Sequence, residues 1–209
     1  MMSKRKIARH WSAKPLVIAA ALTPAFWLAW QFPDGLGFNP IETLNRETGD
    51  WALRFLILTL AVSPLAKVTR TADLIRFRRI IGLAAFGYAA LHLSSYIILD
   101  QGLDWAAIWA DVVKRNFITV GAVAALLLLP LAATSTDAMM RKLGAKRWRG
   151  LHRLTYPAAI LACLHYFMMV KADTTEPLIY AAILSALLGH RIWSRNHTLP
   201  RASAKAIHT

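Results

Sequence analysis

The sequence predicts an all-α membrane protein, a bundle of six transmembrane helices with both chain termini in the cytoplasm. Of its 209 residues, 56% are apolar and only 17% are charged, whereas soluble domains carry about 25% charged residues. The apolar residues form runs of the length that a bilayer crossing needs. The charged residues gather between these runs, with basic and acidic segments in alternation. Composition, run length and charge order therefore agree on one multi-pass membrane domain.

Six apolar runs define the expected helices, since a bilayer crossing takes about 17–25 mostly apolar residues. The first run follows a basic tail, residues 1–14, and has no convincing cleavage site, so we expect a retained helix rather than a signal peptide. The second and sixth runs are the weakest by length. A second cytoplasmic tail, residues 194–209, follows the membrane domain, residues 15–193. The runs cover residues 15–31, 51–67, 80–99, 116–133, 151–170 and 177–193.

Charge sets the expected orientation, because cytoplasmic segments of membrane proteins carry the excess of Lys and Arg. Basic residues dominate the segments before the first run, between the second and third, between the fourth and fifth, and after the sixth. Six crossings place all four basic segments in the cytoplasm, and an odd number would not. The other three segments hold nine of the eleven acidic residues: Asp34, Glu42, Glu47, Asp50, Asp100, Asp104, Asp111, Asp173 and Glu176.

Several classes of protein are excluded or disfavoured by the same features. The formal charge of +14 is typical of nucleic-acid binding, but its clustering beside apolar runs indicates a lipid bilayer and no nucleic acid. Cys163 is the only cysteine, so neither an internal disulfide nor covalent C-x-x-C-H heme attachment is possible. No Rossmann or P-loop motif is present, so electrons from NAD(P)H would need a separate reductase. No carboxylate lies inside an expected span, which disfavours an ion-coupled transporter.

Two histidines, His92 in the third run and His165 in the fifth, are the ionisable residues deepest in the expected spans. From the helical rise, His92 lies about 20 Å beyond Arg79, and His165 lies about 24 Å beyond Arg149. The third and fifth helices run in the same direction, so both imidazoles are expected at one depth, in the outer half of the membrane. Facing histidines suit the two axial positions of a heme iron. The alternative is a hydrogen bond between helices without a cofactor.

A second site at the cytoplasmic side is less well defined. His152 lies at the start of the fifth run, where the third run offers no histidine, so a second heme would need another ligand such as His190. Both residues are otherwise interfacial histidines near lipid headgroups. Four arginines at this level either neutralise heme propionates or a flavin phosphate or only enforce the topology. These arginines are Arg78, Arg79, Arg149 and Arg153.

Three segments resemble a known family. R-R-I-I-G-L-A-A-F-G-Y-A-A-L-H-L-S-S-Y (78–96) and W-R-G-L-H-R-L-T-Y-P-A-A-I-L-A-C-L-H-Y (148–166) are similar to the third and fifth helices of the MsrQ family, formerly YedZ. G-F-N-P-I-E-T-L-N-R-E-T-G-D-W-A-L-R-F (37–55) is similar to its first periplasmic loop. This family belongs to the ferric-reductase-like transmembrane superfamily. The resemblance implies His92, His152 and His165 as heme ligands.

What the resemblance implies about function is electron relay across a bacterial inner membrane. The family's members are heme-binding membrane subunits of a system that repairs oxidised methionine in periplasmic proteins. The resemblance implies one b-type heme, with a second possible, and an associated FMN. It implies quinol or a cytoplasmic flavin reductase as donor, and the molybdopterin subunit MsrP as acceptor. The chain would then be a redox subunit rather than the catalytic one. The rival functions are a stand-alone ferric or quinone reductase and a cofactor-free, transporter-like membrane protein.

Overall fold

The computed structural model describes residues 4–196, and every regular element in this part of the chain is a helix. Short 3₁₀ turns and one π-helical segment, Ser95–Asp100, join or extend the α-helices. The π-helical segment continues α3 without a break. The eight α-helices are α1 (Lys4–Gln31), α2 (Pro40–Val68), α3 (Arg78–Ser94), α4 (Trp105–Lys114), α5 (Asn116–Ala133), α6 (Asp137–Leu151), α7 (Thr155–Met169) and α8 (Thr175–Asn196).

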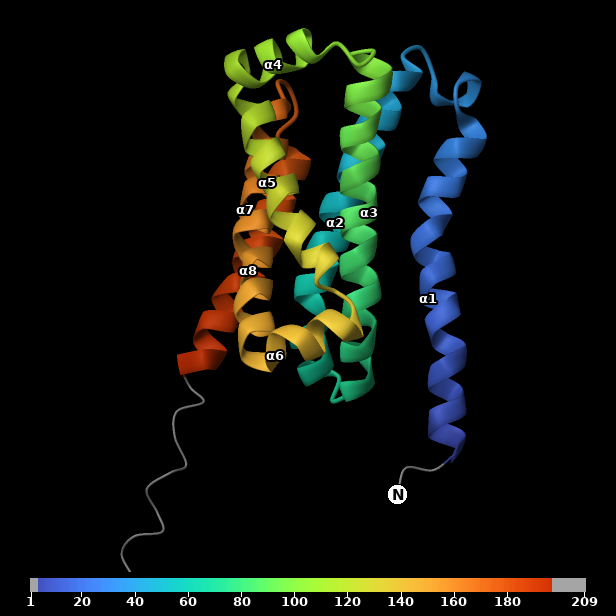
Figure 1. The fold of residues 1–209 in the computed structure, drawn as a ribbon, viewed down its shortest axis with the longest axis vertical. Helices are drawn as coiled ribbons and strands as arrows, with labels where there is room; N and C mark the ends of the chain where they lie inside the picture. The colour runs from blue at the N-terminus through green and yellow to red at the C-terminus, as the bar shows by residue number, and fades with distance from the viewer. Residues whose placement is uncertain (1–3, 197–209) are drawn as a thin grey trace, which may run out of the picture.

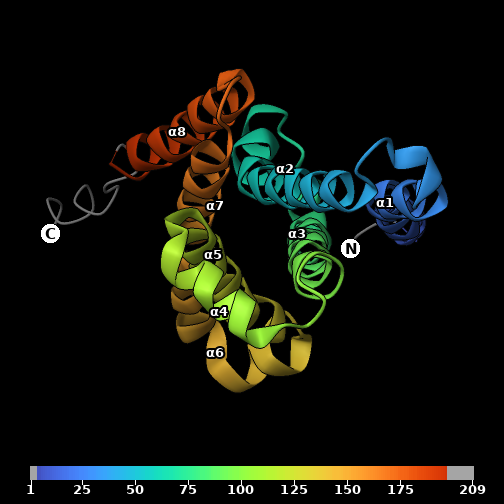
Figure 2. The same cartoon turned by 90° about the horizontal axis from the view of Figure 1, so that it is seen from above.

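The long helices run along the long axis of the molecule, and α4 and α6 lie across its two ends (Figure 1). Helices α2, α3, α5 and α7 form the centre of the bundle. Helix α1 stands at one side, next to α3, and α8 packs beside α7 and α2 on the other side (Figure 2). The bundle therefore brings α3 and α7, which carry His92 and His165, into its centre.

The membrane-spanning character predicted from sequence is confirmed for four helical segments. Ala13–Gln31, Pro40–Val68, Ala72–Asp100 and Asn116–Ala133 are long and apolar enough to cross a bilayer. The last of these has the bounds that the sequence predicts. The two remaining runs, 151–170 and 177–193, correspond to α7 and α8, but α7 has only 15 residues and α8 carries charge at both ends. The protein is thus a helical membrane protein, and the number of six crossings stays a prediction.

The start of the second helix differs from its prediction. Helix α2 begins at Pro40, eleven residues before the expected position, so the acidic segment is helical rather than a loop. The Asn39 side chain caps the helix by accepting a bond from the Glu42 backbone N–H at 3.3 Å. With 29 residues, α2 is about 44 Å long, against a hydrocarbon core of about 30 Å. It is therefore longer than a bilayer crossing needs, and Asp50 belongs to the same helix as the second predicted span, one residue before the expected start of that span.

Two helices, α4 and α6, were not predicted because neither is an apolar run of spanning length. Asp104 caps α4 by accepting bonds from the backbone N–H groups of Ala106 and Ala107 at 2.9 and 3.0 Å. Thr136 caps α6 by accepting a bond from the Met139 N–H at 3.2 Å. Both caps satisfy helix N-termini that are close to the membrane surface. The connection from α3 to α5 and the connection from α5 to α7 therefore each contain a short helix.

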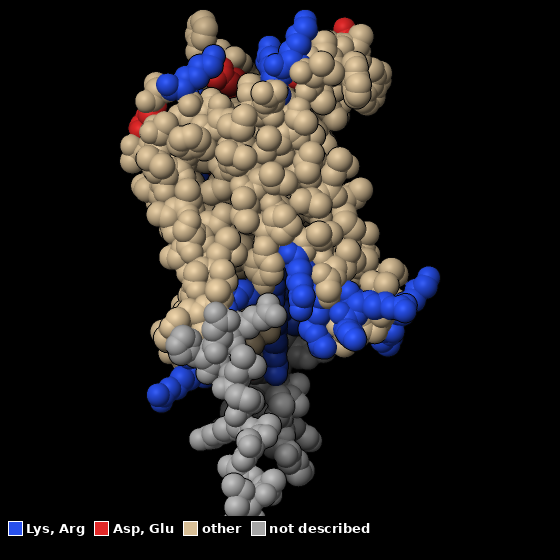
Figure 3. Space-filling model, turned by 90° about the vertical axis from the view of Figure 1, so that its left-hand side faces the viewer, with Lys and Arg blue, Asp and Glu red and all other residues tan. Residues whose placement is uncertain are grey.

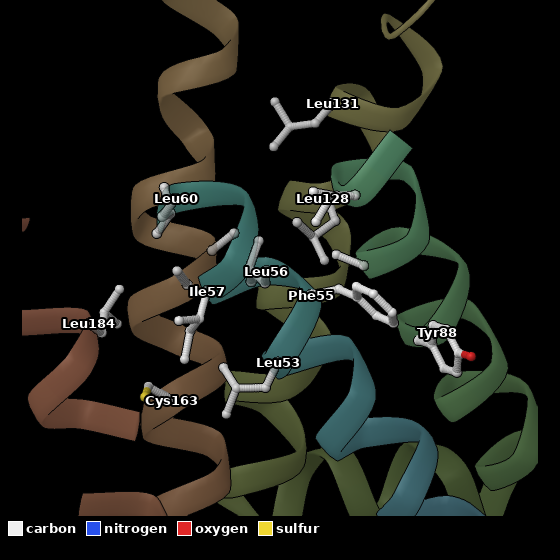
Figure 4. Close-up of a cluster of buried hydrophobic side chains, with 14 of the residues drawn as sticks. Leu53, Phe55, Leu56, Ile57, Leu60, Tyr88, Leu128, Leu131, Cys163 and Leu184 are labelled. Atoms are coloured by element: carbon white, nitrogen blue, oxygen red, sulfur yellow. The ribbon is translucent and has the colours of Figure 1, made fainter. Parts of the chain in front are cut away.

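The bundle is closed by apolar side chains that α2 directs toward α3, α5 and α7, among them Leu53, Leu56 and Leu60 (Figure 4). Ala85 and Ala158 are completely buried, so these alanines of α3 and α7 serve close helix packing. Cys163 is buried in the same core. Large apolar side chains also cover the outside of the bundle, as expected of a surface in contact with lipid.

Charge is distributed unequally between the two ends of the molecule. In the view of Figure 3, Lys and Arg crowd the end at which α6 lies, and Asp and Glu are seen only at the opposite end, where some Lys and Arg side chains lie beside them. Helix α1 begins and α8 ends at the basic end (Figure 1). This arrangement agrees with the alternation of basic and acidic segments in the sequence.

Helix α1 is fastened to α3 through one hydroxyl group. Tyr88 Oη donates to the carbonyl oxygen of Ala21 and accepts from the backbone N–H of Ala25, both at 2.9 Å. In a regular helix these two backbone groups would bond to each other, and Pro24 lies in the same turn of α1, where proline disfavours a regular ladder. The Tyr88 hydroxyl supplies a hydrogen-bond partner to both backbone groups. Such a partner is needed because lipid forms no hydrogen bonds with the backbone.

We expect Tyr88→Phe to destabilise the packing of α1 on α3. The substitution keeps the ring but leaves two backbone groups without their shared partner, at a cost of roughly 1–3 kcal/mol. The measurement is the midpoint of thermal unfolding in detergent, compared with Tyr96→Phe. The Tyr96 hydroxyl donates to Asp111 Oδ2 at 3.0 Å, away from α1. Equal midpoints for wild type and Tyr88→Phe would contradict a role in fastening α1.

Candidate heme site: the histidine pair

His92 on α3 and His165 on α7 lie next to each other inside the bundle. Their ring centroids are 6.1 Å apart, and the ring planes meet at 71°. The helical rise predicted similar depths for His92 and His165, and the structure places the two side chains next to each other. Both side chains are half-buried between helices.

Each imidazole is held by a backbone carbonyl of a neighbouring helix. His92 Nδ1 lies 2.9 Å from the carbonyl oxygen of Asn45 on α2, and His165 Nδ1 lies 2.7 Å from that of Phe117 on α5. A carbonyl oxygen only accepts, so each Nδ1 carries the proton and donates it. The tautomer that remains has an unprotonated Nε2 on the other side of each ring. This is the arrangement that metal-binding histidines usually have.

Two glycines allow these close approaches. A Cβ atom on Gly49 would lie 3.0 Å from His92 Nδ1, and one on Gly121 would lie 2.8 Å from both Nδ1 and Cε1 of His165. Each glycine is four residues after the accepting carbonyl, on the same face of the same helix. Each ring thus rests against a carbonyl group and a glycine of one neighbouring helix, and we call this pair of residues its seat. The seat of His92 is Asn45 and Gly49, and the seat of His165 is Phe117 and Gly121. Sequence reasoning missed them, because a helical glycine has no pattern that distinguishes a ring seat from ordinary packing.

The geometry fits a group that is ligated from two opposite sides. Two imidazoles across one metal ion have ring centres roughly 6 Å apart, because a metal–nitrogen bond is about 2 Å and each nitrogen lies about 1 Å from its ring centre. The separation of 6.1 Å agrees with this value. Within residues 4–196, no three His, Cys, Asp or Glu side chains cluster in a way that could hold a metal ion. Two axial ligands suit heme iron, whose other four ligands come from the macrocycle.

The structure places the other candidate histidines elsewhere. His152 stacks on Trp148 with ring centroids 3.9 Å apart, and its Nε2 lies 3.2 Å from Thr134 Oγ1. His190 lies beside Trp193, with ring centroids 6.4 Å apart. Neither faces another histidine in the described part of the chain. A ligand role for His152 therefore stays a prediction and would require Nε2 to exchange its contact with Thr134.

The four candidate arginines lie at the basic end, far from the histidine pair. Arg79 Nη1 binds Asp137 Oδ1 at 2.6 Å, and Arg78 is half-buried at the start of α3. Arg149 and Arg153 are exposed. Arg79 precedes His92 by thirteen residues, which is about 20 Å along the helix. The four lie at the level of His152 rather than of the histidine pair, and their predicted role beside a second heme or a flavin phosphate stays a prediction.

A polar cluster that the sequence did not reveal lies close to the pair, at the outer ends of α2, α7 and α8. Arg54 Nε donates to the Tyr180 hydroxyl at 2.9 Å, and an Arg54 Nη atom lies 3.9 Å from Asp50. The Tyr166 hydroxyl donates to Glu176 at 2.7 Å. Because Asp50 follows Gly49 and Tyr166 follows His165, the cluster adjoins both histidine seats. It connects them with the acidic end of the molecule.

A comparison with protein families matches residues 48–163 to the ferric reductase like transmembrane component. The match includes His92 and His152 and ends two residues before His165. This match agrees with the helical membrane fold and with the histidine pair. The protein is therefore a ferric-reductase-like transmembrane component.

Known proteins refine this class. The chain is 55% identical to a protein-methionine-sulfoxide reductase heme-binding subunit, MsrQ, of Rhodospirillum rubrum, over 84% of this chain and 85% of the relative. It is 49% identical to that of Xanthomonas euvesicatoria over 88% and 87%, and 44% identical to that of Caulobacter vibrioides over 90% of each. The chain belongs to the MsrQ family.

Proposed function

We propose that this protein relays electrons through a b-type heme held between His92 and His165. The observation that carries the proposal is the facing pair of imidazoles, each with Nδ1 bonded to a carbonyl and Nε2 left for ligation. Bound heme would supply one-electron chemistry, its iron alternating between the ferric and ferrous states. The chain's residues would position it, fix both tautomers and exclude water. The name of the relatives, heme-binding subunit, supports this assignment.

The proposed direction of transfer is outward across a bacterial inner membrane. Basic residues at the end that carries α6 support a cytoplasmic location for both termini. The histidine pair then lies in the outer half of the membrane, near a periplasmic acceptor. We propose quinol or a cytoplasmic flavin reductase as donor and an MsrP-like molybdopterin subunit as acceptor, in accordance with the relatives' place in methionine sulfoxide reduction. A second heme and FMN stay predictions of the family resemblance.

The test is a visible spectrum of the purified protein in nanodiscs, followed through one cycle of reduction and reoxidation. We expect a b-type reduced-minus-oxidised signal that forms with a quinol or with NADH plus a flavin reductase. The signal should decay when an MsrP-like subunit and methionine sulfoxide are added together. A well-folded, colourless protein would overturn the proposal. Equally fast reoxidation by ferric chelates without a partner would instead favour a stand-alone ferric reductase.

A further inference from the structure

An apolar cavity of about 520 Å³ lies between α1, α2 and α3, at the side of the bundle where α1 stands (Figure 2). Its walls are apolar side chains from all three helices, among them Leu22, Phe26, Leu44 and Leu91. Phe26 and Leu91 are also 71% and 47% exposed, so the cavity opens on the lipid-facing side of the bundle. Its volume is within the range of about 300–1,000 Å³ that is usual for small-molecule sites. A ligand of this cavity would enter from the membrane and would be apolar over most of its surface.

Two buried polar side chains also line the cavity: Thr48 on α2 and Ser95 in the π-helical segment, 3% and 6% exposed. The Thr48 hydroxyl donates to the carbonyl oxygens of Leu44 and Asn45, at 2.7 and 2.9 Å. The Ser95 hydroxyl donates to the carbonyl oxygen of His92 at 2.9 Å. A hydroxyl group has one proton to donate but two lone pairs. Because both protons are committed to backbone carbonyls, these side chains offer a ligand hydrogen-bond acceptors and no donor.

The same two hydroxyls connect the cavity with the candidate heme ligand His92. The Asn45 carbonyl that accepts from Thr48 also accepts from His92 Nδ1, at 2.9 Å. Ser95 is bonded to the backbone of His92 itself. A molecule in contact with both hydroxyls would therefore be separated from His92 by only one or two hydrogen-bonded groups. This position suits an electron donor, an argument that rests on the proposed function, in which His92 holds heme.

We infer that this cavity binds the head group of a membrane quinol in preference to the corresponding quinone, and that Thr48 and Ser95 accept hydrogen bonds from its hydroxyl groups. The ring and tail of a quinol are apolar and match the walls of the cavity. Its two hydroxyl groups are donors and match the two acceptors. A quinone has only carbonyl acceptors in their place, which would face acceptors of the protein. The site should therefore favour the reduced molecule and release the oxidised one.

The experiment measures binding of ubiquinol-1 and of ubiquinone-1 to the whole protein in nanodiscs, without oxygen, by calorimetric titration against empty nanodiscs. We expect the wild type to bind the quinol roughly tenfold more tightly, since each net hydrogen bond contributes about two- to tenfold. The double variant Thr48→Val/Ser95→Ala should lose this preference and bind both molecules alike. Thr59→Val is the matched control and should keep it. The Thr59 hydroxyl is buried on the same helix and donates to the Phe55 carbonyl at 2.8 Å, outside the cavity.

A second variant tests the place of binding and leaves both hydroxyls intact. Ala29 lines the cavity, and the ring of Ala29→Phe would occupy part of its volume. We expect this variant to lose ubiquinol-1 binding and to slow heme reduction by ubiquinol-1 about tenfold or more. Heme reduction by dithionite and the visible spectrum should stay as in the wild type, because the substitution touches neither histidine nor its seat.

Three results would decide against the inference or against the relay. Undiminished ubiquinol-1 binding in Ala29→Phe would place the quinol elsewhere. Equal affinities of the wild type for ubiquinol-1 and ubiquinone-1 would overturn the selection of the reduced form. A heme-free protein that still binds ubiquinol-1 with the expected preference would support the cavity and contradict the proposed electron relay instead.

Discussion

Replacement of either His92 or His165 by alanine is expected to remove the b-type spectrum of the purified protein. If the pair ligates heme as proposed, each substitution deletes one of its two ligands, and the remaining imidazole would not hold the iron from both sides. Changes outside the ligands of a metal site already lower affinity roughly 10–100-fold, so loss of a ligand should do at least as much. The measurement is heme content per protein from the reduced-minus-oxidised spectrum and the pyridine hemochrome.

Controls separate loss of a ligand from loss of the fold. Addition of free imidazole should restore part of the spectrum in the alanine variants, because the ring would enter the space that the side chain left. His190→Ala, beside Trp193 at the other end of the bundle, should keep the wild-type spectrum. His152→Ala distinguishes one heme from two, since only a second heme would lower the heme content. Full heme content in both His92→Ala and His165→Ala would exclude the pair as ligands.

The sequence allowed prediction of those parts of the structure that depend on long apolar runs. The segment 116–133 becomes α5 with the expected bounds because charged residues precede it and a capped turn follows it. The position of the histidine pair followed from the helical rise alone. By contrast, α6 combines basic and apolar residues and was read as a connection, since a helix on the membrane surface needs no apolar run. The start of α2 was missed because Asn39–Pro40 marks a helix cap as readily as a loop.

The adjacency of His92 and His165 was predictable from the sequence, but the groups that hold their rings were not. A histidine in an apolar run is conspicuous, because a polar side chain at that depth needs a partner. The partners are the carbonyl oxygens of Asn45 and Phe117, and backbone atoms have no residue-specific signature. The polar cluster of Asp50, Arg54 and Tyr180 depends on α8 returning to α2, a contact between segments 126 residues apart. One sequence does not contain that information.

The second large effect is expected from adding a single methyl group behind a histidine. Alanine at position 121 would place Cβ 2.8 Å from His165 Nδ1, which is closer than atoms can pack. The ring or the helix must then move, and the 2.7 Å bond from Nδ1 to the Phe117 carbonyl is lost. We expect Gly121→Ala to lower heme affinity roughly 10–100-fold, the range found when the partner of a ligating histidine is removed. Gly49→Ala should have the same effect, to a smaller extent, since its Cβ would lie 3.0 Å from His92 Nδ1.

Gly87→Ala is the matched control, because a Cβ at this position of α3 would meet no atom within 4 Å. In the interior of a helix, alanine is favoured over glycine by about 1 kcal/mol, so this variant should unfold at the same or a higher temperature and bind heme normally. The same substitution, glycine to alanine, is therefore expected to weaken heme binding at positions 49 and 121 and to leave it unchanged at position 87. The difference depends on whether a histidine ring contacts the glycine. Heme titrations of the three apoprotein variants, together with their electron paramagnetic resonance spectra, measure affinity and axial ring geometry separately. Wild-type affinity and spectra in Gly121→Ala would mean that the close approach of His165 to α5 does not position a ligand.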